Sequence, residues 1–206
     1  MTRILGTAVG AFMLGAVPSG YVVGRLWGKD IRLWGSGRMG GTNVFRTCGP
    51  VAAALTVIAD VLKAVAAVWL ATWLVGTGWS QVLAGSLAVL GHIYTPFLNW
   101  RGGRGVATAI AVLAVFCPLC AAAVLVAAGV VMVASRYVSL ASLTAATLMP
   151  VALLLYYLTF GGDYVRITYG VFACLAIWIA HRDNVQRLIQ GTERRLGEKA
   201  TPAGSS

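Results

Sequence analysis

Residues 34–46 combine glycine, hydroxyl, amide and arginine side chains in one short connection, Trp-Gly-Ser-Gly-Arg-Met-Gly-Gly-Thr-Asn-Val-Phe-Arg. Its closely spaced glycines allow backbone N–H groups to curl around an anion. Ser36, Thr42 and Asn43 add neutral hydrogen-bond donors, while Arg38 and Arg46 add positive charge. A nucleotide-binding phosphate loop is excluded because its Gly-Lys-Ser/Thr sequence is missing. The pattern predicts a loop that binds a phosphate group, and a flexible basic loop is the alternative.

A second glycine-rich connection, residues 101–108, reads Arg-Gly-Gly-Arg-Gly-Val-Ala-Thr and leads directly into an apolar stretch. Unpaired amides and the dipole at the start of a helix attract anions, which favours a second phosphate contact here. Taken alone, this connection also fits a turn whose charge only sets membrane topology. A third polar cluster, His181-Arg182-Asp183-Asn184 with Glu193 further on, follows the last apolar stretch. Three such clusters on one face indicate a site for an anionic substrate.

Other kinds of chemistry lack their residues in this chain. Two histidines and a small number of acidic residues offer no spacing typical of metal ligands, so neither a metal nor another cofactor is expected. The His-x-x-x-x-Asp motif of acyltransferases that use acyl-CoA is missing, since Phe97 and Gln186 stand where the aspartate would be. Covalent catalysis through Ser36 is disfavoured because no histidine neighbours it in sequence to activate it.

The elements that must hold these clusters are apolar. Of 206 residues, 59% are hydrophobic and 11% are charged, against roughly 25% charged residues in an average globular protein. A soluble domain of this length needs more polar groups to cover its surface, so we expect an all-α integral membrane protein. The 16 Lys and Arg residues outnumber 6 Asp and Glu, which gives a net charge of +10. In a membrane protein this excess first sets topology, and no nucleic-acid partner is expected.

Apolar stretches long enough to cross a membrane occupy about residues 4–26, 50–75, 79–98, 106–134, 137–160 and 164–180. All but three of the 16 basic residues fall in connections that the positive-inside rule places in the cytoplasm. The N-terminus is then outside, and an even number of crossings must separate residues 105 and 182. A proline break at residues 116–118, giving helices of about 106–117 and 119–134, satisfies this parity. We therefore expect seven transmembrane helices with a cytoplasmic C-terminus, and five spans are the alternative.

Residues 1–200 are expected to form a single membrane-embedded domain, followed by a loose tail over residues 201–206. Asp60 and Lys63 lie deep in the second apolar stretch, and their i,i+3 spacing favours a structural ion pair over a functional site. His92 is interpreted as a packing or interfacial residue. A transporter or channel for an anionic metabolite is the alternative function, but it predicts polar residues along the whole membrane path. A lipid-binding structural protein would explain the charge but not the glycine spacing.

Several motifs occur together in an order that resembles one known family. They are Gly-Ser-Gly-x-x-Gly-x-Thr-Asn from residue 35 with Arg46, Asp60-x-x-Lys63, Gly-Gly-x-Gly-Val-Ala-Thr from residue 102, Ser-Arg-Tyr-Val-Ser-Leu from residue 135, and His181-Arg182-x-Asn184 through Gly191-Thr192-Glu193. From about residue 17 to residue 199 the chain resembles the bacterial acyl-phosphate:glycerol-3-phosphate acyltransferases, the PlsY family. The resemblance implies a seven-helix enzyme of the bacterial inner membrane with its active site at the cytoplasmic face.

The resemblance also implies the reaction. A fatty acyl group would pass from acyl phosphate to the 1-hydroxyl of glycerol 3-phosphate, giving 1-acyl-glycerol 3-phosphate (lysophosphatidic acid) and inorganic phosphate as the first step of phospholipid synthesis. Because an acyl phosphate already carries a good leaving group, no covalent acyl-enzyme is expected. The expected partners are these two substrates and membrane lipid, without an obligate protein partner.

Site residues follow from the same resemblance, position by position. Catalytic roles fall on His181, Ser36 and Arg46. Substrate binding falls on Ser36, Gly37, Gly40, Thr42, Asn43, Arg46, Gly102, Gly103, Arg104, Ser139, His181, Asn184 and Glu193. The chain departs from the family with Arg38 for Asn, Gly41 for Ala and Arg104 for Lys, which puts the geometry of these contacts in doubt. We expect a substrate phosphate oxygen to accept the hydroxyl proton while His181 positions glycerol 3-phosphate, although His181 itself could be the base.

Overall fold

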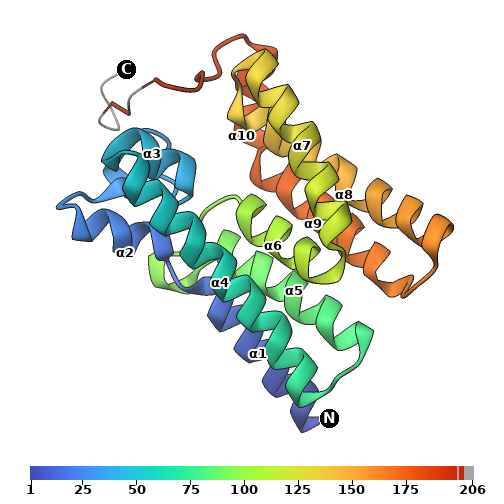
Figure 1. The fold of residues 1–206 in the computed structure, drawn as a ribbon. Coiled ribbons are helices and arrows are strands. Elements are labelled where there is room, and N and C mark those ends of the chain that lie inside the picture. Colours follow the sequence, from blue (N-terminus) through green and yellow to red (C-terminus); the bar gives the residue numbers. More distant parts are fainter. Residues whose placement is uncertain (199, 202–206) are drawn as a thin grey trace.

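The computed structural model describes residues 1–198, 200 and 201, and this part of the chain folds into helices without a strand (Figure 1). The helices are α1 (Thr2–Ala16), α2 (Ser19–Leu26), α3 (Gly41–Cys48), α4 (Pro50–Leu74), α5 (Gly78–Ile93), α6 (Val106–Phe116), α7 (Pro118–Ser135), α8 (Val138–Phe160), α9 (Val165–Ala180) and α10 (Arg182–Ile189), with the 3-10 turns η1 (Ile31–Leu33) and η2 (Pro96–Leu98). The all-α prediction is confirmed. Of the predicted tail, residues 202–206 lie outside the described residues, and the Thr201 carbonyl accepts a hydrogen bond from the Gly35 amide at 2.9 Å.

Five helical segments are long and apolar enough to cross a membrane: Thr2–Leu26, Pro50–Leu74, Gly78–Leu98, Pro118–Ser135 and Val138–Phe160. Two shorter apolar helices, α6 and α9, bring the candidates to the predicted number only if they also cross. The predicted break is confirmed, because α6 ends at Phe116 and α7 begins at Pro118. The seven-span count and its orientation stay predictions.

Small residues let the first and third long segments approach closely. Gly15 in α1 and Gly91 in α5 face the opposite backbone so tightly that a Cβ on either would overlap a carbonyl oxygen, of Ala88 and Phe12 respectively. Ala11 and Ala88 in the same contact are fully buried. Close backbone packing of this kind is typical of helices in membranes, where lipid competes with apolar side chains.

The second half of the bundle packs around α9. Tyr169 is fully buried, its hydroxyl donates to the Ala109 carbonyl of α6 at 2.9 Å, and Phe116 meets its ring edge-on.

The outer face of α7 is apolar and exposed, with Val130 at 64% and Val133 at 78% exposure. Figure 1 shows α2, α3 and α10 together at the end of the molecule away from the N-terminus. The fold thus sets the short polar helices α3 and α10 at one end of an apolar bundle.

Candidate active site

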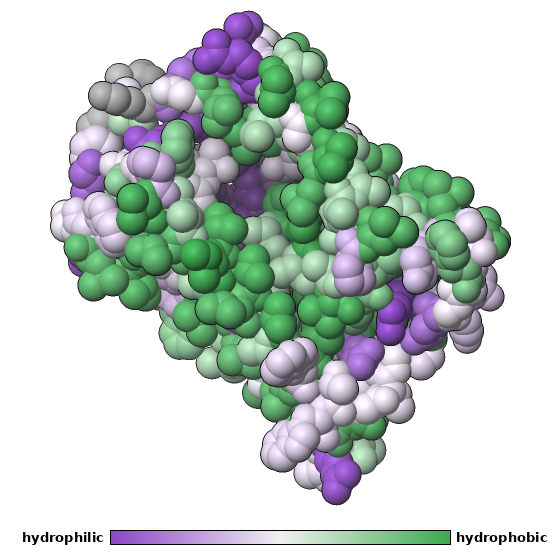
Figure 2. Space-filling view, in the orientation of Figure 1, coloured by the Kyte–Doolittle hydropathy of each residue, from purple (hydrophilic) through white to green (hydrophobic). Residues whose placement is uncertain are grey.

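A cavity of about 530 Å³ opens among α3, α4, α6 and α8, at the end of the bundle where α3 and α10 lie. Its polar lining comes from all three clusters that the sequence singled out. The polar residues are Ser36, Arg38, Thr42, Asn43, Asp60, Arg46, His92, Arg104, Ser139, Ser142, His181 and Glu193. Figure 2 shows a hollow with a hydrophilic floor between two hydrophobic surfaces. The predicted convergence of segments 36–46, 104–107 and 181–193 on one site is confirmed.

Two helices begin at this cavity. The lining includes Gly40 and Thr42 at the start of α3 and Gly105 and Ala107 at the start of α6. The first N–H groups of a helix have no partner within it and carry the positive end of the dipole. Two N-termini aimed at one cavity therefore form a double anion site, built from backbone alone.

Asn43 builds the first loop. Its side chain is buried, and its amide nitrogen lies 2.9–3.2 Å from three backbone carbonyl oxygens, of Ile31, Trp34 and Arg38. Its amide oxygen accepts the N–H of Ser36 at 3.2 Å. These contacts use the polar atoms of Asn43, so its side chain shapes the loop. The Ser36 hydroxyl oxygen accepts the Arg38 N–H at 3.4 Å, which leaves the hydroxyl hydrogen free to donate.

Three of the predicted substrate-binding glycines donate hydrogen bonds within the protein. The N–H groups of Gly102 and Gly103 donate to the carbonyls of Ile93 and His92, each at 3.0 Å, and the N–H of Gly37 donates to the Trp34 carbonyl at 2.9 Å. A Cβ on Gly102 or Gly103 would overlap His92. These amides are therefore engaged within the protein, and the glycines at 102 and 103 permit close packing between the loop and α5. Their part in substrate binding stays a prediction.

Arg104 supplies the charge of the second element. Its side chain is largely buried, and its Nε has no hydrogen-bond partner among the described residues. Burial, reinforced by repulsion from Arg38, lowers the pKa of Arg104 to about 10, which still leaves it charged at neutral pH. A cation without a partner inside a cavity is a strong site for an anion.

Two further arginines surround the same cavity. Arg46 in α3 donates through Nη2 to the carbonyls of Arg194 and Arg195 at 3.3 and 3.2 Å, and burial lowers its pKa. Arg38 lies 3.9 Å from the Asp183 carboxylate, a loose contact that leaves most of its donors free. The structure thus gathers around one cavity two arginines of the first connection, Arg38 and Arg46, and the distant Arg104.

His181 enters the cavity between α9 and α10 and is 2% exposed. Its Nδ1 lies 2.9 Å from the Ile177 carbonyl oxygen. Because a carbonyl only accepts, Nδ1 carries the proton and Nε2 of the neutral ring is an acceptor. Burial, then the charge of Arg104, lowers the pKa of His181 to about 4, so the ring is neutral at pH 7. Such a ring can accept a hydrogen bond from a substrate hydroxyl, whereas it cannot donate to a phosphate from Nε2.

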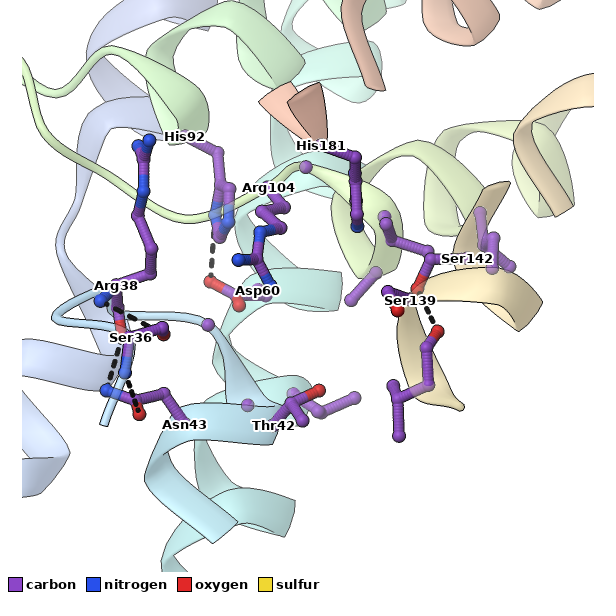
Figure 3. A pocket seen from close by; sticks show the side chains of 18 of the residues that line it. Ser36, Arg38, Thr42, Asn43, Asp60, His92, Arg104, Ser139, Ser142 and His181 are labelled. Carbon is purple, nitrogen blue, oxygen red and sulfur yellow. Dashed lines mark hydrogen bonds and ion pairs between the residues drawn. The ribbon is translucent and has the colours of Figure 1, made fainter. Parts of the chain in front are cut away.

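Of the remaining predicted residues, Ser139, Glu193 and Thr42 line the cavity and Asn184 does not. Ser139 faces the cavity (Figure 3), and its buried hydroxyl has no hydrogen-bond partner in the described chain. Glu193 also lines it, but its carboxylate accepts from Asn184 at 2.7 Å and from Arg187 at 2.8 Å. Asn184 is buried, lies outside the lining and holds Glu193, while its amide oxygen has no hydrogen-bond partner among the described residues. Its part in substrate binding stays a prediction. Thr42 lines the cavity as predicted.

Two lining residues were underestimated from the sequence. The predicted ion pair is confirmed, with Lys63 Nζ 2.8 Å from the Asp60 carboxylate. His92 joins it, its Nδ1 lying 3.0 Å from Lys63 Nζ, and both Asp60 and His92 face the cavity. Ionisable residues deep in an apolar helix were the available signal. Ser142 also lines the cavity, one helical turn after Ser139, and nothing in the sequence singled it out.

The other end of the cavity is apolar. It is lined by Val57 and Val61 of α4, Ile110 and Ala114 of α6, and Leu125 of α7. Leu125 is 52% exposed, so this end reaches the apolar outer surface of the bundle. In Figures 1 and 2 the opening lies between α4 and α7. The site therefore joins a cationic end to an apolar end that opens sideways, a shape that fits an amphiphile with an anionic head.

The sequence profile described as "Glycerol-3-phosphate acyltransferase" matches residues 5–191. This chain belongs to the glycerol-3-phosphate acyltransferase family. The glycerol-3-phosphate acyltransferase of Symbiobacterium thermophilum is 40% identical over 202 residues, covering 98% of this chain and 99% of that protein. The enzyme of the same name from Carboxydothermus hydrogenoformans is 40% identical over 197 residues, covering 95% and 98%.

The fold of this acyltransferase family member matches a solved relative. PlsY, described as an integral membrane glycerol 3-phosphate acyltransferase, superposes in its glycerol 3-phosphate form with a TM-score of 0.85. The two sequences are 33% identical, and the match covers 94% of this chain and 96% of PlsY. The lysophosphatidic acid form of PlsY gives a TM-score of 0.84 at 32% identity. The chain is thus an acyltransferase-family membrane protein with the PlsY fold.

Proposed function

We propose that this protein transfers a fatty acyl group from acyl phosphate to the 1-hydroxyl of glycerol 3-phosphate, releasing inorganic phosphate and 1-acyl-glycerol 3-phosphate. The observation that carries this proposal is the two-ended cavity, cationic at the loops and apolar where it opens between α4 and α7. Acyl phosphate is an amphiphile with a dianionic head, and glycerol 3-phosphate is a second dianion. Arg38, Arg46, Arg104 and two helix N-termini provide the positive charge that two such dianions need to lie close together.

The reaction then follows from positioning. The glycerol hydroxyl attacks the acyl carbonyl carbon, a C–O ester bond forms, and the bond between that carbon and the phosphate oxygen breaks. The hydroxyl proton passes to an oxygen of the departing phosphate. His181 Nε2 accepts a hydrogen bond from the attacking hydroxyl and so orients it. A serine nucleophile is not required, which fits a Ser36 hydroxyl whose described contact is a backbone amide and not a histidine.

The proposal also places the protein in a membrane. The chain would form one membrane-embedded domain over residues 1–200, with seven spans, an outside N-terminus and the cavity at the cytoplasmic face of the bacterial inner membrane. Support comes from the gathering of α2, α3 and α10 at the end remote from the N-terminus (Figure 1) and from the arginines around the cavity. A soluble glycerol 3-phosphate pool and a lipid-borne acyl donor would meet at such a site.

The test uses the purified full chain in lipid vesicles with palmitoyl phosphate and labelled glycerol 3-phosphate. The expected result is labelled lysophosphatidic acid and an equal amount of released phosphate, without CoA. A parallel reaction with palmitoyl-CoA should give no product. Product from the thioester alone would overturn the proposed donor, and label that accumulates inside vesicles without lipid product would favour an anion transporter.

A further inference from the structure

Asp60, Lys63 and His92 form a buried cluster between α4 and α5. Figure 3 shows Asp60 and His92 beside Arg104. The three side chains are between 2% and 6% exposed. Lys63 Nζ lies 2.8 Å from the Asp60 carboxylate and 3.0 Å from His92 Nδ1, and it donates to the Val17 carbonyl at 2.9 Å. That carbonyl belongs to the break between α1 and α2. Lys63 Nζ also lies 3.4 Å from the Ser19 hydroxyl, so four groups surround the three hydrogens of the ammonium group.

The contact with Lys63 fixes the proton on His92. Nδ1 of His92 lies 3.0 Å from Lys63 Nζ and 3.4 Å from the Asp60 carboxylate. An ammonium group has no acceptor, so in the shorter contact Lys63 donates, Nδ1 accepts, and the ring proton of a neutral His92 lies on Nε2. The Nε2 edge of the ring lies directly against Gly103, where a Cβ would overlap it. The His92 carbonyl accepts the Gly103 N–H, and the next carbonyl, that of Ile93, accepts the Gly102 N–H. His92 therefore supports the loop with both its side chain and its backbone.

Arg104 follows Gly103 directly, and α6 begins two residues later. Since Nε of Arg104 has no hydrogen-bond partner in the described chain, the loop backbone sets where its side chain starts and points. Buried ion pairs rarely stabilise a protein more than apolar side chains of the same size. Stability alone therefore does not explain an ionic cluster inside an apolar bundle, and we expect it to have a functional role as well.

We propose that Asp60, Lys63 and His92 act as a positioning cluster, which holds the loop 102–105 against α5 and so fixes Arg104 and the N-terminus of α6 in the cavity. The proposal rests on the proposed function for the role of Arg104 in phosphate binding. The cluster acts through the loop, because the His92 ring lies against Gly103 and the His92 carbonyl accepts the Gly103 N–H. Lys63 extends the same support to the break between α1 and α2 through the Val17 carbonyl.

The test is a double-mutant cycle between His92→Asn and Arg104→Gln. The asparagine oxygen can replace Nδ1 as the acceptor for Lys63, but the ring no longer reaches Gly103. We expect His92→Asn to lower kcat/KM by about 10²-fold, as for a misplaced catalytic group, and Arg104→Gln by about 10²- to 10³-fold. In the Arg104→Gln background, His92→Asn should cost no more than about threefold, because the residue it positions is already gone. His92→Gln, whose amide can reach the place of Nε2, should recover much of the activity that His92→Asn loses, and a proton-transfer role would not allow this.

Thr56→Val is the matched control, since Thr56 is a buried polar residue of α4 whose hydroxyl donates to the Ala52 carbonyl and to no member of the cluster. It should leave kcat/KM unchanged in both backgrounds. The same double-mutant cycle is then repeated with a second measurement, which is how much inorganic phosphate stabilises each variant against thermal unfolding. Equal losses from His92→Asn in both backgrounds, by both readouts, would overturn the positioning role. Coupling in phosphate binding without any acyl transfer would keep the positioning role and overturn the proposed function.

Discussion

Replacing Arg104 by lysine should turn a permanently charged group into one that titrates near pH 8. Burial, with repulsion from Arg38 as a smaller cause, takes the pKa of Arg104 from 12.5 to about 10. A lysine, ordinarily near 10.4, would lose its charge around pH 8 if the same surroundings acted on it equally. Because a group with a lowered pKa is charged below it and neutral above it, activity of Arg104→Lys should be present below pH 8 and decline as the pH rises.

The assay is kcat/KM for acyl phosphate between pH 6.5 and 9, since this parameter reports ionisations of the free enzyme. The unsubstituted protein should vary little from pH 7 to pH 9, while Arg104→Lys should fall about tenfold over that interval. Adding Arg38→Asn should move the decline upward in pH by part of its range, because burial remains the larger cause. A lysine variant with a flat profile through pH 9 would refute the idea that this cavity desolvates its cation. The expected decline would also explain why this chain combines arginine at both positions, where the resemblance implies Asn at 38 and Lys at 104.

Three further predictions test the other parts of the site and the bundle. His181→Ala should lower kcat by about 10²-fold at saturating substrate, and kcat/KM of the unsubstituted enzyme should show no His181 ionisation between pH 5.5 and 7, because its pKa lies near 4. Asn43→Ala should lower the free energy of unfolding by about 1–3 kcal/mol and raise KM for glycerol 3-phosphate, measured by thermal unfolding in detergent and by kinetics. Gly15→Ala should cost about 1–3 kcal/mol of stability because its Cβ meets the Ala88 carbonyl, whereas Gly6→Ala, with open space around it, should cost little.

The sequence predicted the helical class and one of the two helix breaks. Pro118 was found because the parity of crossings required a break in that stretch, and a proline stood where it was needed. Pro18 was not found, because the apolar run through it continues to Leu26 and hydropathy alone reads it as one helix. The missed break matters, since it frees the Val17 carbonyl that Lys63 binds.

The candidate site could be predicted as a set of segments but not as a set of contacts. Counting basic residues by connection placed the clusters on one face, and the cavity confirms their meeting. The role of Gly103 could not be read from its neighbours in sequence, because glycine serves both anion binding and close packing. The partner that decides between them, His92, lies on another helix. The same holds for Asn43, whose buried contacts depend on the path of the loop before it.

The excess of basic residues has a meaning at the cavity that a topology argument alone does not supply. Each of its two acids is already engaged, Asp60 by Lys63 and Glu193 by Arg187. No carboxylate among the described residues forms an ion pair with Arg104, so its charge is left for a ligand. A third buried carboxylate beside it would neutralise that cation and repel each incoming phosphate. The scarcity of acids, 6 against 16 basic residues, therefore favours the proposed binding of two dianions in this cavity.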